Sequence, residues 1–208
     1  MIKAWEEALG TQKIMVIRHA EKPASYGGVS CEGVQADGKQ NRRSLVTLGW
    51  ERAGGLVTLM APPWGPAAGL SVPAHLFAAD PAEKGKAKGS DDEPSQRPYE
   101  TITAVAAKLG LAIDSTYRKD KYKHMADAAL ACEGVVLIAW QHQDIPAIGA
   151  HLLKHSGASG ITLPTTWPQD RYDLVWVFDR PSGSGPITAF TQVPQLLLAG
   201  DLASVLPV

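Results

Sequence analysis

The amino-acid sequence predicts an α/β fold, a three-layer α/β/α sandwich in which helices cover both faces of a mostly parallel central sheet. Along the chain, short runs of β-branched and apolar residues alternate with longer segments of helical character. The chain has 208 residues, of which 45% are hydrophobic, enough for one α/β domain with a sizeable core and too few for two. We therefore expect a single domain over residues 1–208.

Five short runs have the composition of buried strands, beginning with KIMVI and followed by AHLFAA, VVLIAW, DLVWVF and ITAFTQV. They predict strands at residues 13–17, 74–79, 135–140, 173–178 and 187–193. The segments between them predict helices at residues 47–60, 98–109, 122–132 and 145–155. Pro98 falls in the first turn of its helix, a position that proline favours. The run 81–94, PAEKGKAKGSDDEP, lacks an apolar period and predicts a flexible solvent loop.

Charge and targeting signals narrow the function classes. Twenty basic residues nearly balance 21 acidic ones, so no overall field favours nucleic acid or an anionic membrane. The first residues lack the apolar run of a signal peptide, and no stretch has the roughly 20 apolar residues of a membrane span. We expect a cytoplasmic protein with no nucleic-acid or membrane partner. Cys31 and Cys132 lack disulfide or zinc spacing, and we expect free thiols.

Polar side chains gather where the predicted strands end. The first strand ends in Arg18 and His19, and VVLIAW is followed by His142. Arg97 stands just before a predicted helix. Ligands of open α/β sheets bind beyond the carboxyl ends of the strands, so we expect these four side chains to converge on one edge.

Two arginines and two histidines suit phosphoryl transfer. The planar guanidinium group of an arginine can donate two parallel hydrogen bonds to two phosphate oxygens, and it keeps its charge at working pH. A neutral imidazole can attack phosphorus, and a covalent phosphohistidine divides one difficult displacement into two easier ones. The second histidine can donate a hydrogen bond to the transferring group. Nothing in this arrangement requires a metal.

In their order along the chain, these segments resemble the histidine phosphatase superfamily, also called phosphoglycerate mutase-like. VIRHAEKP looks like the family's Arg-His motif at the end of the first strand, and SLVTLGWERAGGL is similar to the helix that follows. SQRPYETITAVAAKLG and VVLIAWQHQDIPAIGAHL look like the segments that supply the second arginine and the second histidine. The resemblance implies His19 as nucleophile, with Arg18, Arg97 and His142 holding the phosphoryl group. It also implies a phosphohistidine intermediate without a metal or organic cofactor.

The chain departs from the family pattern after the nucleophile. Ala20 stands where glycine is common, a variant associated with an Arg-His-Ala-Glu-Lys subgroup. Glu21 follows directly, and we expect it to bind substrate or to orient a neighbouring group.

The proton donor is the second departure. We expect Asp144, which shares a strand end with His142, to protonate the leaving group. The competing interpretation is a helix N-cap, a position that aspartate suits equally well. No motif singles out the other candidates, Asp114, Asp120 and Asp127.

His151 and His155 stand four residues apart on a predicted helix, a spacing that can hold zinc. The residues between them lack the glutamate of the metalloprotease motif, and no third ligand follows at a suggestive distance. Histidine is also favourable near a helix C-terminus, so we expect a solvent-facing helix end and no metal.

The sequence thus predicts a metal-independent phosphomonoester hydrolase whose partner is a phosphorylated small molecule or a phosphoprotein. A phosphomutase, a phosphoprotein or phosphohistidine phosphatase, and a phospholigand-binding protein with weak turnover stay open. The physiological substrate and the oligomeric state also stay open, because loop side chains around the site set substrate choice.

Overall fold

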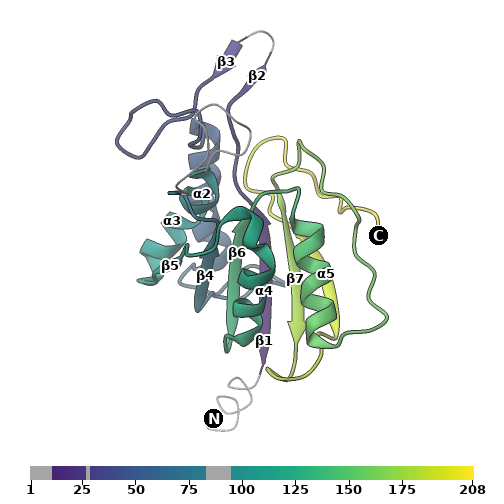
Figure 1. Ribbon diagram of the computed structural model, residues 1–208. Coiled ribbons are helices and arrows are strands. Elements are labelled where there is room, and N and C mark those ends of the chain that lie inside the picture. The colour runs from purple at the N-terminus through teal and green to yellow at the C-terminus, as the bar shows by residue number, and fades with distance from the viewer. Residues whose placement is uncertain (1–10, 27–28, 83–94) are drawn as a thin grey trace.

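A computed structural model describes residues 11–26, 29–82 and 95–208. Its main element is a six-stranded sheet in the order β5-β4-β6-β1-β7-β8 (Figure 1). The strands are β1 (Gln12–Arg18), β4 (His75–Ala78), β5 (Ile113–Asp114), β6 (Val135–Trp140), β7 (Leu174–Arg180) and β8 (Ala189–Pro194). A separate hairpin of β2 (Ala24–Tyr26) and β3 (Val29–Cys31) projects beyond one edge of this sheet (Figure 1).

The sheet is mostly parallel. β5, β4, β6 and β1 run in the same direction, whereas β7 is antiparallel to β1 and β8 is antiparallel to β7. The carboxyl ends of β1, β4 and β6 therefore share one edge with the amino end of β7. We call this the β1 edge.

Helices cover both faces of the sheet, which confirms the predicted three-layer sandwich. Ile14 and Val16 of β1 pack into the core cluster that contains residues of α4 (Tyr122–Ala131) and α5 (Ile145–Ser156). Met15 and Ile17 pack with α2 (Thr47–Met60) and α3 (Arg97–Leu109) on the other face. This alternation follows from the two-residue period of a strand.

The helix ends follow local sequence chemistry. α3 and α5 each carry proline in the first turn, where no intrahelical N–H bond is lost. Both end at glycine in the left-handed region, Gly110 with φ 67° and Gly157 with φ 77°.

All five predicted strands and all four predicted helices are present, with ends within two residues of the prediction. β2, β3, β5 and the 3₁₀ turn η2 (Lys119–Lys121) were not predicted, because two or three residues are too short to show a period. Of the predicted loop 81–94, residues 83–94 lie outside the described residues. Over the part of the chain that is described, every helix is too short or too polar to cross a membrane.

Candidate active site

His19 and His142 leave neighbouring parallel strands at the β1 edge. Arg18 pairs with Trp140 in the sheet register, and the backbone N–H of His19 donates to the Trp140 carbonyl oxygen at 2.9 Å. The ladder thus continues one residue past β1. His142 follows two residues after Trp140, so both histidines sit at the same edge, as the sequence predicts.

The tautomer of His19 is set by its backbone neighbour. His19 Nδ1 lies 2.7 Å from the carbonyl oxygen of Ala20. A carbonyl oxygen can only accept, so Nδ1 carries the proton and Nε2 keeps its lone pair. Burial, followed by the charges of Arg97 and Arg18, holds the pKa of His19 well below its usual range. The ring is therefore neutral at neutral pH, as a nucleophile must be.

The described residues bind only one of the three nitrogens of the Arg18 guanidinium. The side chain is fully buried, and its Nη1 donates to the carbonyl oxygens of Gln169 at 2.6 Å and Arg171 at 2.9 Å. Its Cζ lies 3.7 Å from the centre of the Tyr172 ring. Among the described residues, neither Nε nor Nη2 has a hydrogen-bond partner. Burial lowers the pKa of Arg18 to about 10, so the group stays charged at neutral pH.

Unpaired buried donors are rare in native structures, since each lost hydrogen bond costs about 1–3 kcal/mol and more for a charged group. Nε and Nη2 form one side of the guanidinium fork, the side that pairs with two oxygens of a carboxylate or phosphate. An oxyanion bound here would satisfy both Arg18 donors.

The first turn of α3 brings Arg97 to the same place. Thr101 Oγ1 accepts from the Ala20 backbone N–H at 2.8 Å and donates to the Arg97 carbonyl oxygen at 2.7 Å. The fully buried Thr101 thus joins α3 to the residue that follows His19. The Arg97 charge is the largest electrostatic influence on His19 after burial.

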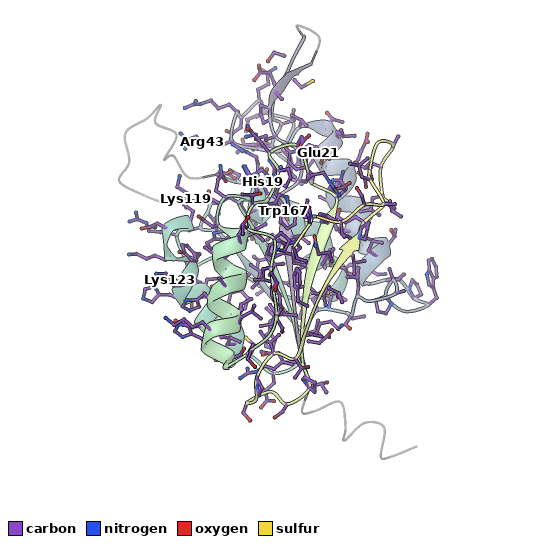
Figure 2. All side chains as sticks on the ribbon, turned by 90° about the vertical axis from the view of Figure 1, so that its right-hand side faces the viewer. His19, Glu21, Arg43, Lys119, Lys123 and Trp167 are labelled. Carbon is purple, nitrogen blue, oxygen red and sulfur yellow. The ribbon has the colours of Figure 1, made fainter. Side chains whose placement is uncertain are left out.

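His142 and Lys22 complete the group. Burial, Arg18 and Lys22 lower the pKa of His142 to about 4, and its buried Nδ1 has no partner within the described part of the chain. Burial, Arg18 and Arg97 lower the pKa of Lys22. The site therefore combines two neutral imidazoles with three cationic groups, a combination suited to an anion with several negative charges. Figure 2 shows the neighbourhood of His19 with side chains drawn.

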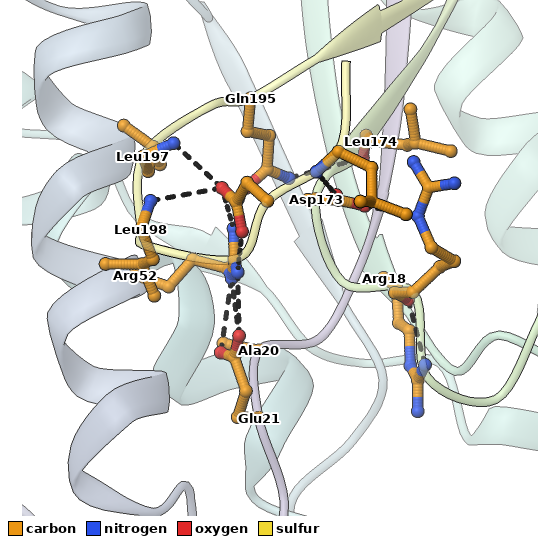
Figure 3. A network of polar contacts seen from close by, with 12 residues as sticks. Arg18, Ala20, Glu21, Arg52, Asp173, Leu174, Gln195, Leu197 and Leu198 are labelled. Carbon is orange, nitrogen blue, oxygen red and sulfur yellow. Dashed lines mark hydrogen bonds and ion pairs between the residues drawn. The ribbon is translucent and has the colours of Figure 1, made fainter. Parts of the chain in front are cut away.

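Glu21 is placed differently from the substrate-binding role expected for it. Both of its carboxylate oxygens accept from Arg52, at 2.7 Å for the shortest contact (Figure 3). Arg52 also binds Asp201 at 2.7 Å and Gln195 at 3.0 Å. With both oxygens engaged in a buried network, Glu21 fixes the segment after His19, which corresponds to the orienting role.

Asp144 is the N-cap residue of α5, although its side chain makes no capping hydrogen bond. Its carboxylate accepts from Gln141 Nε2 at 2.5 Å. Burial raises the pKa of Asp144, which favours the protonated form that a general acid requires. Its charged neighbours are Lys119 and Asp120, whereas those of His142 are Arg18 and Lys22. The proton-donor role of Asp144 stays a prediction.

Sequence reasoning missed two residues of this site. Tyr172 stacks on Arg18 and faces the His19 ring at 6.2 Å between centroids. It precedes β7, which reaches the β1 edge only because β7 is antiparallel, and the sequence does not reveal strand direction. Lys22 was not singled out in the sequence. Its position within five residues of a strand that ends in arginine and histidine was the one available signal.

No protein-family model matches this chain, and no curated protein matches it. Solved structures with similarity include two proteins provisionally named phosphohistidine phosphatase SixA, from Nakamurella multipartitia and Agrobacterium tumefaciens. The first is 14% identical with a TM-score of 0.44 and covers 88% of this chain and 96% of its own; the second is 16% identical with a TM-score of 0.43 and covers 86% and 97%. A phosphoglycerate mutase from Bacillus anthracis str. Sterne is 14% identical, has a TM-score of 0.43 and covers 89% and 93%. Similarities at this level carry no argument about activity, so the side chains at the β1 edge must supply it.

Proposed function

We propose that this protein is a phosphomonoester hydrolase of the histidine phosphatase type, in which His19 forms a phosphohistidine intermediate. The observation that carries the proposal is a pair of buried Arg18 donors, without a partner in the described part of the chain, beside a neutral imidazole. A phosphoryl group satisfies those donors, and the Nε2 lone pair of His19 supplies the nucleophile. The ordered motifs that resemble the histidine phosphatase superfamily support the same assignment.

In the first chemical step, His19 Nε2 attacks phosphorus while the bond from phosphorus to the ester oxygen breaks with its electron pair. Asp144 gives its carboxyl proton to that oxygen, and an alcohol leaves. Arg18, Arg97 and His142 hold the non-bridging oxygens, where charge accumulates in the transition state.

In the second step, water attacks phosphorus and the nitrogen–phosphorus bond breaks. The electron pair returns to His19 Nε2, and the Asp144 carboxylate takes the proton of the water. Inorganic phosphate is released and both side chains recover their starting states. The hydrogen bond from Nδ1 to the Ala20 carbonyl oxygen keeps Nε2 unprotonated for the next turnover.

The test is hydrolysis of an aryl phosphate between pH 4 and 8 with EDTA present. We expect wild-type turnover to survive chelation and His19→Ala to lose at least about 10³-fold. His75→Ala is the matched control, because His75 is an exposed histidine at the opposite end of the parallel strands. Acid-labile phosphate trapped on the wild type and absent from His19→Ala would identify the intermediate. Equal activity of wild type and His19→Ala would overturn the proposal.

A phospholigand-binding protein with weak turnover is the second candidate. The observation that favours it is the orientation of Asp144, whose carboxylate binds Gln141. Inorganic phosphate or vanadate binding that depends on Arg18, with no aryl phosphate turnover, would support this candidate. A fall in the hydrolysis rate of Asp144→Asn that is larger for a poor leaving group than for a nitrophenolate would instead support the general-acid role.

A further inference from the structure

A second cluster of titratable side chains lies between α4 and α5. Asp127 Oδ1 is 2.6 Å from His151 Nε2 and 3.6 Å from His155 Nδ1. The two imidazole rings are stacked, with centroids 3.8 Å apart and planes inclined by 17°. Figure 2 labels Lys123, one helical turn before Asp127, on the flank of the molecule away from His19.

The cluster follows from the packing of two helices. His151 and His155 are four residues apart on α5 and so share one face. α4 packs beside this helix through buried residues such as Ala126 and Ile148, which places Asp127 opposite the histidines. The third side chain comes from a different helix, which explains why no third ligand was evident in the sequence near His155.

We propose that Asp127, His151 and His155 form a binding site for a divalent transition metal of the zinc class. One ligand atom from each residue lies within 4.8 Å of the other two. Zinc bonds of about 2.0–2.2 Å hold tetrahedral ligand atoms roughly 3.3 Å apart, so shifts of about 1 Å bring all three onto one ion. Two imidazoles and one carboxylate are a donor set that suits zinc.

Hydrogen bonding alone accounts for only part of this geometry. The short contact between Asp127 and His151 is a hydrogen bond, but 3.6 Å is too long for a hydrogen bond to His155. His155 is 45% exposed and yet holds its ring parallel to that of His151, with Nδ1 near the same carboxylate oxygen. An ion shared by three ligands accounts for both contacts.

The site opens to solvent, which leaves coordination positions for water. It lies in a surface hollow of about 520 Å³ that is also lined by His124 and by two lysines, Lys123 and Lys154. The lysine charges oppose a cation, so we expect micromolar rather than nanomolar affinity for zinc. His124 lies in the same hollow but outside the group of three mutually close ligand atoms.

The test is a calorimetric titration of the EDTA-treated, desalted full chain with Zn²⁺. We expect one equivalent to bind and the affinity to fall at least about 30-fold in His155→Gln and in Asp127→Asn. His124→Gln is the matched control from the same hollow and should stay within about twofold of wild type. Co²⁺ in place of Zn²⁺ should give a visible absorption band in the wild type that His155→Gln lacks.

Zinc should also link α4 to α5. At a free zinc concentration 100 times Kd, we expect the wild-type Tm to rise by about 5–10 °C, and that of His155→Gln to stay unchanged. The His155 side chain is 45% exposed, so the variant should keep the metal-free Tm of wild type. No saturable binding to wild type, or an equal loss of affinity in His124→Gln, would overturn the proposal. The outcome is independent of the proposed hydrolase, whose assay contains EDTA.

Discussion

At the scale of single residues, Arg18 performs two tasks with one guanidinium. Nη1 donates to the backbone carbonyl oxygens of Gln169 and Arg171, while Nε and Nη2 have no partner among the described residues and are the proposed donors to an oxyanion. A lysine ammonium is a compact charge without a planar fork and cannot serve both directions.

Arg18→Lys should therefore lose both functions. We expect vanadate or phosphate affinity to fall at least about tenfold, because a bidentate contact becomes a single one, and the Tm to fall as well. Calorimetric titration and thermal unfolding measure the two effects. Arg118→Lys, at a partly exposed arginine, is the control and should change neither. Unchanged phosphate affinity in Arg18→Lys would argue against Arg18 as the anion ligand.

Tyr172 supports Arg18 through its ring. Removing the ring in Tyr172→Leu should weaken phosphate binding by about 5- to 30-fold, since a partly desolvated cation–π contact contributes about 1–2 kcal/mol. Tyr172→Phe keeps the ring face and should stay within about twofold of wild type. If Phe and Leu weaken binding equally, the hydroxyl rather than the stacking is the important group.

The placement of Arg18, His19, Arg97 and His142 was predictable from the sequence, because each lies at or just after the end of a strand or opens a helix. Strand ends are visible in one sequence. Tyr172 was not predictable, since its position depends on the direction of β7. Asp127 was not predictable as a partner of His155 either, since that contact depends on how α4 packs against α5. Side-chain partners from separate elements become visible only once the elements are packed.

At the scale of secondary-structure elements, α2 can lie close to the segment after His19 because residue 49 is a glycine. A Cβ at Gly49 would lie 2.7 Å from the Glu21 carbonyl oxygen and 3.0 Å from its nitrogen. Both atoms belong to backbone, which cannot move aside as a flexible side chain can.

Gly49→Ala should therefore destabilise the protein by about 1–3 kcal/mol, the usual cost of overpacking, and should also lower aryl phosphate turnover. Gly54→Ala is the matched control in the same helix, because an added Cβ there meets no described atom within 4 Å. It should stabilise the protein by about 0.5–1 kcal/mol through helix propensity. Denaturant unfolding measures both. Equal effects of the two substitutions would contradict the close approach.

The longer helices and strands were predictable because each is long enough to show the apolar period of its own type of secondary structure. The two-residue strand β5 and the β2–β3 hairpin gain their pairing from neighbours rather than from their own composition. Their absence from the prediction follows from that dependence on context.

At the scale of the whole molecule, the Glu21, Arg52 and Asp201 network joins three distant parts of the chain: the segment after β1, helix α2, and the segment after β8 (Figure 3). All three side chains are almost fully buried, with relative exposures of 4–7%. Arg52 is the cation that both carboxylates share, so removing it leaves Glu21 and Asp201 without a charged partner in this network.

Arg52→Met should destabilise the protein by about 3–5 kcal/mol, because Glu21 and Asp201 remain as uncompensated buried carboxylates. Chemical denaturation measures the loss. Lys39→Met removes a partner from the exposed Asp37 pair and should have an effect within about 0.5 kcal/mol. A loss below about 1 kcal/mol for Arg52→Met would show that the network is dispensable.

Stability should also depend on pH through the buried histidines. The pKa of His142 is about 4 in the folded protein and about 6.5 in the unfolded chain. Between these values the unfolded chain binds the extra proton, so the free energy of unfolding falls as pH drops from 6.5 towards 4.

His142→Gln should reduce that loss by on the order of 1 kcal/mol, allowing for solvent screening. Denaturation midpoints at pH 7 and pH 5 give the comparison, with His124→Gln as the exposed control. An identical pH dependence in wild type and His142→Gln would contradict the low pKa.

The large sequence separation between Arg18 and its backbone partners also determines when the Arg18 side chain can become fixed during protein synthesis. Its backbone partner Arg171 lies 153 residues further along the chain. A growing chain thus carries His19 early, and folding on the ribosome proceeds from the N-terminus. The buried guanidinium gains the fixed orientation that the proposed anion site requires only after residue 171 has emerged. A nascent chain that already displays His19 therefore does not yet have that site.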